Sequence, residues 1–389
     1  MKGSGSGIEG EMMLKSTNLL LSVATAAIAL TAAPFFASAQ DVAPVAHNNV
    51  ALRVESLNST PMAPPPRGLY AVNAIHAYSI DSAILTDAYV DGVVLPFAWS
   101  ALEPQEGQFD WSYVDKLVGQ AANNSKAVSL IINAGAQSPS WVYSDGAQAF
   151  NFIWSKTFFF PVCSKQRLPV PWDPVFQSKW STFVDALAAR YNSNPTVVSV
   201  KMSGLNSVTP EIFLPFATGA KITSGSISCN SNNDVANWQA IGYTPNLAEG
   251  AWNQIANAFH DAFPDKPLEV MLIPGGFPPI NNEGVVFKAT GGQDTEVTDY
   301  IITSGISQFG RQFVVQNDGL SATWIWSTEE SYANQIDTGY QTVGVLGKNL
   351  AATVKLALDG GATYLELYEA DILNSANKST IENAHAQLQ

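Results

Sequence analysis

Two glutamates, Glu211 and Glu366, stand where a pair of carboxylates could do chemistry. Glu211 comes a few residues after a short apolar run, and Glu366 lies inside another, residues 363–368. If that run is a strand, alternation places Glu366 on one face with Tyr364 and Tyr368. A buried carboxylate is costly unless it is hydrogen-bonded or used. Two carboxylates with separated pKa values can serve as a general acid and as a nucleophile or base.

Other interpretations of these residues stay open. Glu211 could be an exposed loop glutamate, and Glu366 could be a structural carboxylate paired with Lys201 or Arg311. The further candidates for the second carboxylate are, in order, Glu369 and the pair Glu329 and Glu330, the last two being expected at the exposed start of a helix.

Eight short apolar runs alternate with segments of helical spacing. The runs cover residues 69–76, 90–99, 128–134, 197–205, 268–273, 312–316, 338–346 and 363–368. Continuous apolar strands are typical of parallel sheets covered on both faces. Eight such units predict an α/β fold, a (β/α)₈ TIM barrel in a single domain. The rival is an open doubly wound sheet, which usually has a glycine-rich turn after its first strand, and residues 73–76 are not one.

The longest segments without regular patterns follow the third and fourth strands. Residues 135–175 and 206–246 are rich in aromatic residues, Gly, Ser and Asn. On a barrel both would lie at the C-terminal face, where active sites form. Each holds one cysteine, Cys163 or Cys229, and an exported protein would join them in a disulfide that ties the loops together. The alternative is two unrelated thiols.

The N-terminal part of the chain has the composition of a leader. Residues 1–12 resemble an extension, and residues 13–39 combine Lys15, an apolar stretch and a small-residue site, which predicts a signal peptide cleaved after Ala39. The alternative, a membrane anchor, is disfavoured because the stretch is shorter than the ~20 residues that span a bilayer. We expect residues 40–67 to be a Pro-rich linker or strap, residues 68–389 to be the barrel, and the protein to be secreted or periplasmic.

The composition excludes several classes of protein. Of 389 residues, 46% are hydrophobic, 11% aromatic and only 13% charged, which argues against disorder. The formal charge of −14 argues against binding to nucleic acid and to anionic membranes. No later segment is apolar enough for stable membrane insertion. The four histidines are scattered, so we expect no metal site.

One motif carries a family resemblance. Residues 99–111 read Trp-Ser-Ala-Leu-Glu-Pro-Gln-Glu-Gly-Gln-Phe-Asp-Trp, which resembles a stretch of the retaining barrel glycosidases of clan A, among them bacterial β-galactosidases and endoglycanases. In that clan the segment is structural. The resemblance implies that Asp110 caps a helix, that Trp99 lines the barrel mouth, and that Glu103 and Glu106 are not catalytic.

The resemblance also implies roles at the strand ends. Clan members place the acid/base glutamate after the fourth strand, commonly just after an asparagine, and the nucleophile at the end of the seventh. Here Glu211 does not directly follow Asn206, and residues 338–346 contain no glutamate. We therefore expect Glu211 as acid/base and Glu366 as nucleophile. The predicted substrate-binding residues are Trp99, Asn133, Trp172, Asn206, Gln316, Asn317, Trp326, Tyr368 and Glu369.

The expected activity is hydrolysis of a β-linked glycan or glycoside, without metal or organic cofactor. The partner would be an oligosaccharide or polysaccharide, because aromatic rings in the mouth loops can stack on sugar faces. Three alternatives stay open: a non-catalytic sugar-binding barrel, a structural protein of a surface layer, and a transglycosylase.

Overall fold

The eight predicted strands form a closed parallel barrel. The computed structural model describes residues 63–75, 77–156, 159–289 and 293–389. The barrel order is β1-β12-β11-β10-β9-β6-β3-β2. Its strands are β1 (Gly68–Val72), β2 (Gly92–Ala98), β3 (Ala127–Asn133), β6 (Val197–Met202), β9 (Leu268–Leu272), β10 (Phe313–Leu320), β11 (Thr338–Thr342) and β12 (Tyr364–Tyr368). The barrel prediction is confirmed, and the open sheet is excluded because β1 pairs with β12.

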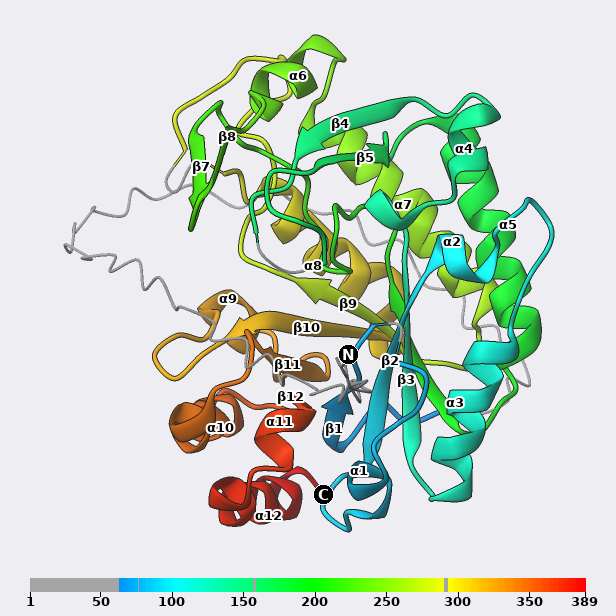
Figure 1. The fold of residues 1–389 in the computed structure, drawn as a ribbon, viewed down its shortest axis with the longest axis vertical. Helices are drawn as coiled ribbons and strands as arrows, with labels where there is room; N and C mark the ends of the chain where they lie inside the picture. The colour runs from blue at the N-terminus through cyan, green and yellow to red at the C-terminus, as the bar shows by residue number, and fades with distance from the viewer. Residues whose placement is uncertain (1–62, 76, 157–158, 290–292) are drawn as a thin grey trace, which may run out of the picture. The chain divides into compact units, whose positions relative to one another are not determined.

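Helices cover the outside of the barrel (Figure 1). The α-helices of the described residues are α1 (Ser82–Thr86), α2 (Trp99–Leu102), α3 (Ser112–Asn123), α4 (Ser140–Ser144), α5 (Pro174–Tyr191), α6 (Asp234–Ala240), α7 (Pro245–Ala262), α8 (Glu296–Phe309), α9 (Ser327–Glu330), α10 (Leu350–Asp359), α11 (Glu369–Ile372) and α12 (Lys378–Leu388). Of these, α6 lies beside the long loops and not against the barrel wall (Figure 1). Within the described residues, none of these is long and apolar enough to cross a membrane. The predicted leader and most of the Pro-rich segment lie outside the described residues.

Helix α5 illustrates why the sequence forms these elements. Asp173 accepts hydrogen bonds from the N–H groups of Val175 and Phe176 at 2.9 and 3.0 Å, and Pro174 occupies the first turn. Phe176, Trp180, Phe183 and Leu187 then recur at helical spacing and are all buried, and together they form the apolar stripe of the helix. The helix packs beside α7.

Strand alternation divides the apolar residues into two cores. The larger core lies between barrel and helices and includes Leu365 and Leu367 of β12. The smaller fills the barrel interior with Tyr70, Val94, Ile131, Met271, Val314 and Tyr364. A Cβ on Gly339 would lie 2.0 Å from the Tyr364 ring, and one on Gly92 would lie 2.3 Å from the Tyr70 ring. Glycine at these positions therefore makes room for two interior tyrosines.

The long loops hold structure that the sequence pattern did not predict. The loop after β3 contains the hairpin β4 (Ala149–Ile153) and β5 (Lys165–Pro169), and the loop after β6 contains the hairpin β7 (Lys221–Ser224) and β8 (Ile227–Asn230). The predicted disulfide between Cys163 and Cys229 is present and joins the two hairpins, which lie together in Figure 1.

Candidate active site

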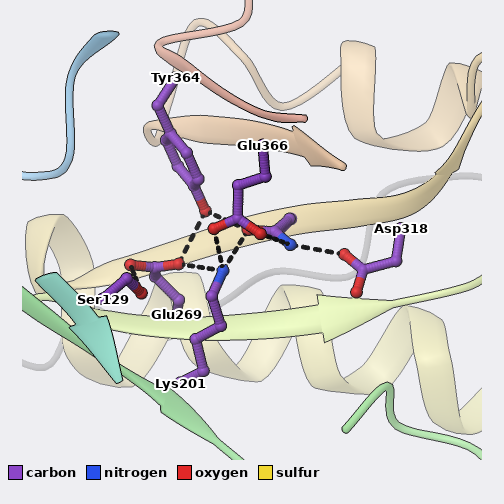
Figure 2. A network of polar contacts seen from close by, with 7 residues as sticks. Ser129, Lys201, Glu269, Asp318, Tyr364 and Glu366 are labelled. Carbon is purple, nitrogen blue, oxygen red and sulfur yellow. Dashed lines mark hydrogen bonds and ion pairs between the residues drawn. The ribbon is translucent and has the colours of Figure 1, made fainter. Parts of the chain in front are cut away.

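A lysine and two glutamates form the polar centre of the barrel interior (Figure 2). Lys201 of β6 places its Nζ 2.6 Å from Glu269 Oε2 of β9 and 2.6 Å from Glu366 Oε1 of β12. All three side chains are fully buried. The inward orientation predicted for Glu366 is confirmed, and so is its pairing with Lys201, one of the two partners considered for a structural carboxylate.

Gln316 of β10 extends this network towards the carboxyl end of the barrel. Its Oε1 accepts a hydrogen bond from Lys201 and lies 2.8 Å from the Tyr364 hydroxyl. Its Nε2 donates to Glu366 Oε2 at 3.0 Å and to Asp318 Oδ1 at 2.7 Å. Because Lys201 has no acceptor atom, its contact fixes which end of the amide carries the oxygen. The amide nitrogen is thereby directed at two carboxylates.

Opposing effects set the charges in this centre. Burial by itself would lower the pKa of Lys201, but Glu269 and Glu366 raise it above its ordinary value. Burial raises the pKa of Glu366, while Lys201 and Gln316 act to lower it. Lys201 is therefore a buried ammonium that has to be balanced by carboxylate.

Two further carboxylates lie near the end of the barrel. Asp318 is the sixth residue of β10, two positions beyond Gln316 and on the same inward face. Glu211 lies in the segment after β6. The next residue, Ile212, forms isolated β-bridges with Asn206 and with Leu272 at the end of β9. Asp318 Oδ2 and Glu211 Oε2 are buried and have no hydrogen-bond partner among the described residues.

These two carboxyl groups influence each other. Burial raises the pKa of Asp318 well above its usual range, and Glu211 raises it further as the largest effect of any charged group. Burial also raises the pKa of Glu211, with Thr209 acting to lower it. Burial raises the pKa of Tyr368 to about 12, with contributions from Glu211, Asp318 and Glu366. Two such acids that interact titrate as a pair, so one can hold a proton while the other is ionised.

A neutral polar side chain completes the barrel end. Asn133 ends β3, whose Ile131 faces the interior, so Asn133 also points inward. It is fully buried, and neither side-chain atom has a partner among the described residues. Buried polar atoms are nearly always satisfied in folded proteins. The unpaired atoms of Asn133, Glu211 and Asp318 can therefore form hydrogen bonds with a molecule from outside the chain.

For several other predicted site residues the structure gives less direct evidence of a role. Asn206 is buried and its amide bonds its own loop, accepting from Gly204 N–H and donating to Thr209 O. Trp172 is partly exposed and packs against Trp238 and Tyr243, at ring distances of 5.4 and 5.7 Å. Its role in binding stays a prediction, as does that of Glu369, whose pKa is raised by burial.

Three predicted substrate contacts are corrected. Trp99 is fully buried among Trp141, Phe176, Trp180 and Phe183 in the outer core, so it does not line the mouth. Asn317 lies on the outward face of β10 with Phe313 and Val315, and its Oδ1 accepts from Gly319 N–H. Trp326 also belongs to the outer core. Ring packing holds Trp99 away from the barrel interior, and strand alternation directs Asn317 away from it.

The Trp99 motif is structural, as the resemblance implied. Glu103 accepts hydrogen bonds from Trp99 Nε1 at 2.7 Å and from Gly107 N–H at 2.8 Å, which occupies both its oxygens. Asp110 accepts from the N–H of Ser112 at 3.0 Å at the start of α3. Neither acid belongs to the barrel interior.

The expectation that Glu329 is exposed is wrong, because its side chain in α9 is fully buried.

Sequence patterns missed two members of the site. Glu269 was not identified although it alternates with the outward-facing Leu268 and Val270 in a five-residue strand. Asp318 was not among the candidates for the second carboxylate. The chain has Ser207 directly after Asn206, and β11 contains no glutamate. Among the described residues no His, Cys, Asp and Glu group has the arrangement of a metal site.

Comparisons with known proteins agree with the barrel. A family model described as beta-galactosidase (Glyco_hydro_42) matches residues 79–206, which include the Trp99 motif and end at Asn206. The catalytic domain of beta-amylase from Paenibacillus polymyxa superposes with a TM-score of 0.56 at 13% identity, covering 82% of this chain and 98% of that one.

Two beta-galactosidases are more distant in structure. That from Rahnella sp. R3 gives a TM-score of 0.44 at 14% identity, and that from Marinomonas ef1 gives 0.43 at 10%. The matches cover 79% and 77% of this chain but only 51% and 54% of theirs. The family match and the closed barrel together fit a clan-A (β/α)₈ glycoside hydrolase, and they support the identification of this chain as a glycosidase.

Proposed function

We propose that the chain hydrolyses a β-linked glycan or glycoside at the carboxyl end of the barrel, with Glu211 as the acid. The observation that carries the proposal is the pair formed by Glu211 and Asp318. Each has a buried carboxyl oxygen without a partner among the described residues, and Glu211 raises the pKa of Asp318. The beta-galactosidase family match suggests β-galactosides as the first substrates to test.

The sequence predicted Glu366 as the second catalytic carboxylate, but the hydrogen bonds in the structure favour Asp318. Glu366 has no exposed surface, and its two oxygens already accept hydrogen bonds from Lys201 and Gln316. Asp318 is 6% exposed and keeps Oδ2 unpaired. Burial and Glu211 raise the pKa of Asp318, and the hydrogen bond from Gln316 Nε2 to Oδ1 acts to lower it, so in the proposed active form of the pair the shared proton lies on Glu211. We therefore assign the ionised role to Asp318 and a positioning role, through Gln316, to Glu366.

The chemistry follows from this division. Glu211 transfers its proton to the glycosidic oxygen as the bond from that oxygen to the anomeric carbon breaks. In a retaining reaction, which the clan resemblance implies, the ionised carboxylate attacks that carbon and forms an ester. Glu211, now ionised, takes a proton from water, and the resulting hydroxide cleaves the ester. Both carboxyl groups return to their starting states.

Single amide variants test these assignments. E211Q, D318N and E366Q would be assayed on an aryl β-galactoside, with E283Q at an exposed position as the control. We expect E211Q and D318N to lose at least about 10²-fold in turnover with unchanged melting temperature. E366Q should lower the melting temperature, because it disturbs the partner of a buried lysine. Full activity in both E211Q and D318N would refute the pair, and inactivity of E366Q at full stability would return the role to Glu366.

Two finer parts of the proposal need their own measurements. Net retention would appear in ¹H NMR spectra as a first-formed product with the β configuration, whereas an α product would show inversion. Export with cleavage after Ala39 is supported by the Cys163–Cys229 disulfide, since disulfides persist in oxidising compartments. Cell fractionation and the N-terminal sequence of the mature chain would test it.

A second candidate function is sugar binding without catalysis. It is favoured by Ser207, which stands directly after Asn206 where the resemblance implies a glutamate, and by the lack of a glutamate in β11. In that case oligosaccharides would bind, as measured by calorimetry, while a screen of aryl glycosides and oligosaccharides would give no product above the E211Q background. Product formation that depends on Glu211 would exclude it.

A further inference from the structure

A polar cleft lies beside the loop that leads to Glu211. It has a volume of about 440 Å³ and is lined by Ala136, Ser138, Ser140, Asn151, Lys165, Gln166 and Arg167. One wall is the segment directly after β3, and the other is the β4–β5 hairpin. The first wall is bonded to the Glu211 loop, because Ala136 N–H donates to Ser207 O at 2.7 Å and Gln137 Nε2 donates to Val208 O at 3.1 Å.

Two cations face this cleft without acidic partners. Lys165 and Arg167 are exposed and two positions apart on β5, so they share a face of the strand. Within the described ranges neither forms an ion pair with a carboxylate, although the chain carries 33 acidic residues. The cleft is therefore a locally positive region on a chain whose formal net charge is −14.

The surroundings fix one cation and add an unsatisfied hydroxyl. The guanidinium carbon of Arg167 lies 4.0 Å from the centroid of the Tyr143 ring, a contact that restricts the planar group. Ser138 Oγ, also at the cleft, is buried and has no hydrogen-bond partner among the described residues. The cleft thus offers oriented donors next to a positive charge.

We propose that this cleft is a subsite for an anionic sugar unit, so that the substrate is an acidic glycan. A uronate carboxylate and a sulfate ester share the chemistry required, since a guanidinium binds the oxygens of either with two parallel hydrogen bonds. Lys165 adds a second positive charge, and Ser138, Asn151 and Gln166 supply groups for hydroxyls. The inference rests on the proposed function, because it treats the adjoining barrel end as the place of cleavage.

Calorimetry on the full chain tests the subsite without requiring turnover. The probes are a neutral galactose trisaccharide, a galacturonate trisaccharide and a sulfated galactan oligosaccharide of similar length. We expect one or both acidic probes to bind roughly tenfold or more tightly than the neutral one, with affinity that falls as salt rises. The acidic probe that binds more tightly shows whether the cleft prefers a carboxylate or a sulfate ester.

Charge variants provide the matched comparison. R167Q and K165Q should each reduce binding of the preferred acidic probe by about tenfold and leave the neutral probe unchanged. K348Q removes the same charge on the exposed segment before α10 and should change neither. Equal affinity for neutral and acidic probes, or equal effects of K348Q and R167Q, would overturn the proposal.

The two proposals fail in different ways. If a neutral aryl glycoside is cleaved through Glu211 but no acidic preference is found, the subsite is refuted and the proposed function stands. If acidic probes bind in an Arg167-dependent manner and no glycoside is cleaved, the subsite stands as a binding site and the hydrolytic function is refuted.

Discussion

Replacing Lys201 by methionine should destabilise the protein strongly. Lys201 has no exposed surface and lies 2.6 Å from a carboxyl oxygen of Glu269 and 2.6 Å from one of Glu366. Methionine fills a similar volume but leaves the carboxyl groups without their cation. Removing one partner of a buried ion pair typically costs about 3–5 kcal/mol, a large share of the 5–15 kcal/mol of a typical domain. The free energy of unfolding, measured by urea titration with circular dichroism at pH 7, should fall by about that amount.

A second substitution should recover part of the loss. In the double variant K201M/E366Q one of the two glutamates that lose their cation is replaced by a neutral amide, so we expect about 1–3 kcal/mol of the stability to return. If K201M costs less than about 1 kcal/mol, or if E366Q adds its own loss to that of K201M, the buried triad does not hold the barrel as argued. An unchanged urea slope would show that both variants unfold from equally compact states.

The pH dependence of the same variant gives an independent check. Burial raises the pKa of Glu366 and Lys201 lowers it, so K201M should raise it further above its value in the unfolded chain. Such a group favours folding fully below its unfolded pKa and loses that contribution as the pH rises through the folded one. The difference in stability between K201M and the parent should therefore be smaller at pH 5 than at pH 8.

Three further predictions concern residues around the site. Burial raises the pKa of Asp234 from 3.8 to about 7, so stability should fall by up to roughly 4 kcal/mol as the pH rises across that interval, and D234N should lack this slope in urea midpoints. Replacing both cysteines of the disulfide, 66 positions apart, by serine should cost about 4 kcal/mol in urea unfolding; no loss would show that the bridge does not constrain the unfolded chain. G339A should cost about 1–3 kcal/mol by displacing Tyr364, whereas G344A, whose added Cβ would meet no atom within 4 Å, should be close to neutral.

The sequence by itself determined the barrel fold and the inward position of Glu366. Eight apolar runs sufficed because strands of a parallel barrel are covered on both faces, and even the weak run at residues 338–346 became β11. Alternation within β12 placed Glu366 inside, since a two-residue period is a local property of the chain. The disulfide also followed from one cysteine in each long loop.

Only the tertiary structure decided which charged groups meet. Lys201 and Glu269 are register partners on β6 and β9, but the pairing of distant strands is set by barrel closure and is not written in either segment. Asp318 entered the site because β10 continues beyond the apolar run that ends at Gln316. Trp99 does not belong to the site, because four aromatic rings from other elements enclose its indole. Spacing along a chain fixes the face on which a side chain lies, whereas its partners depend on the closure of the whole barrel.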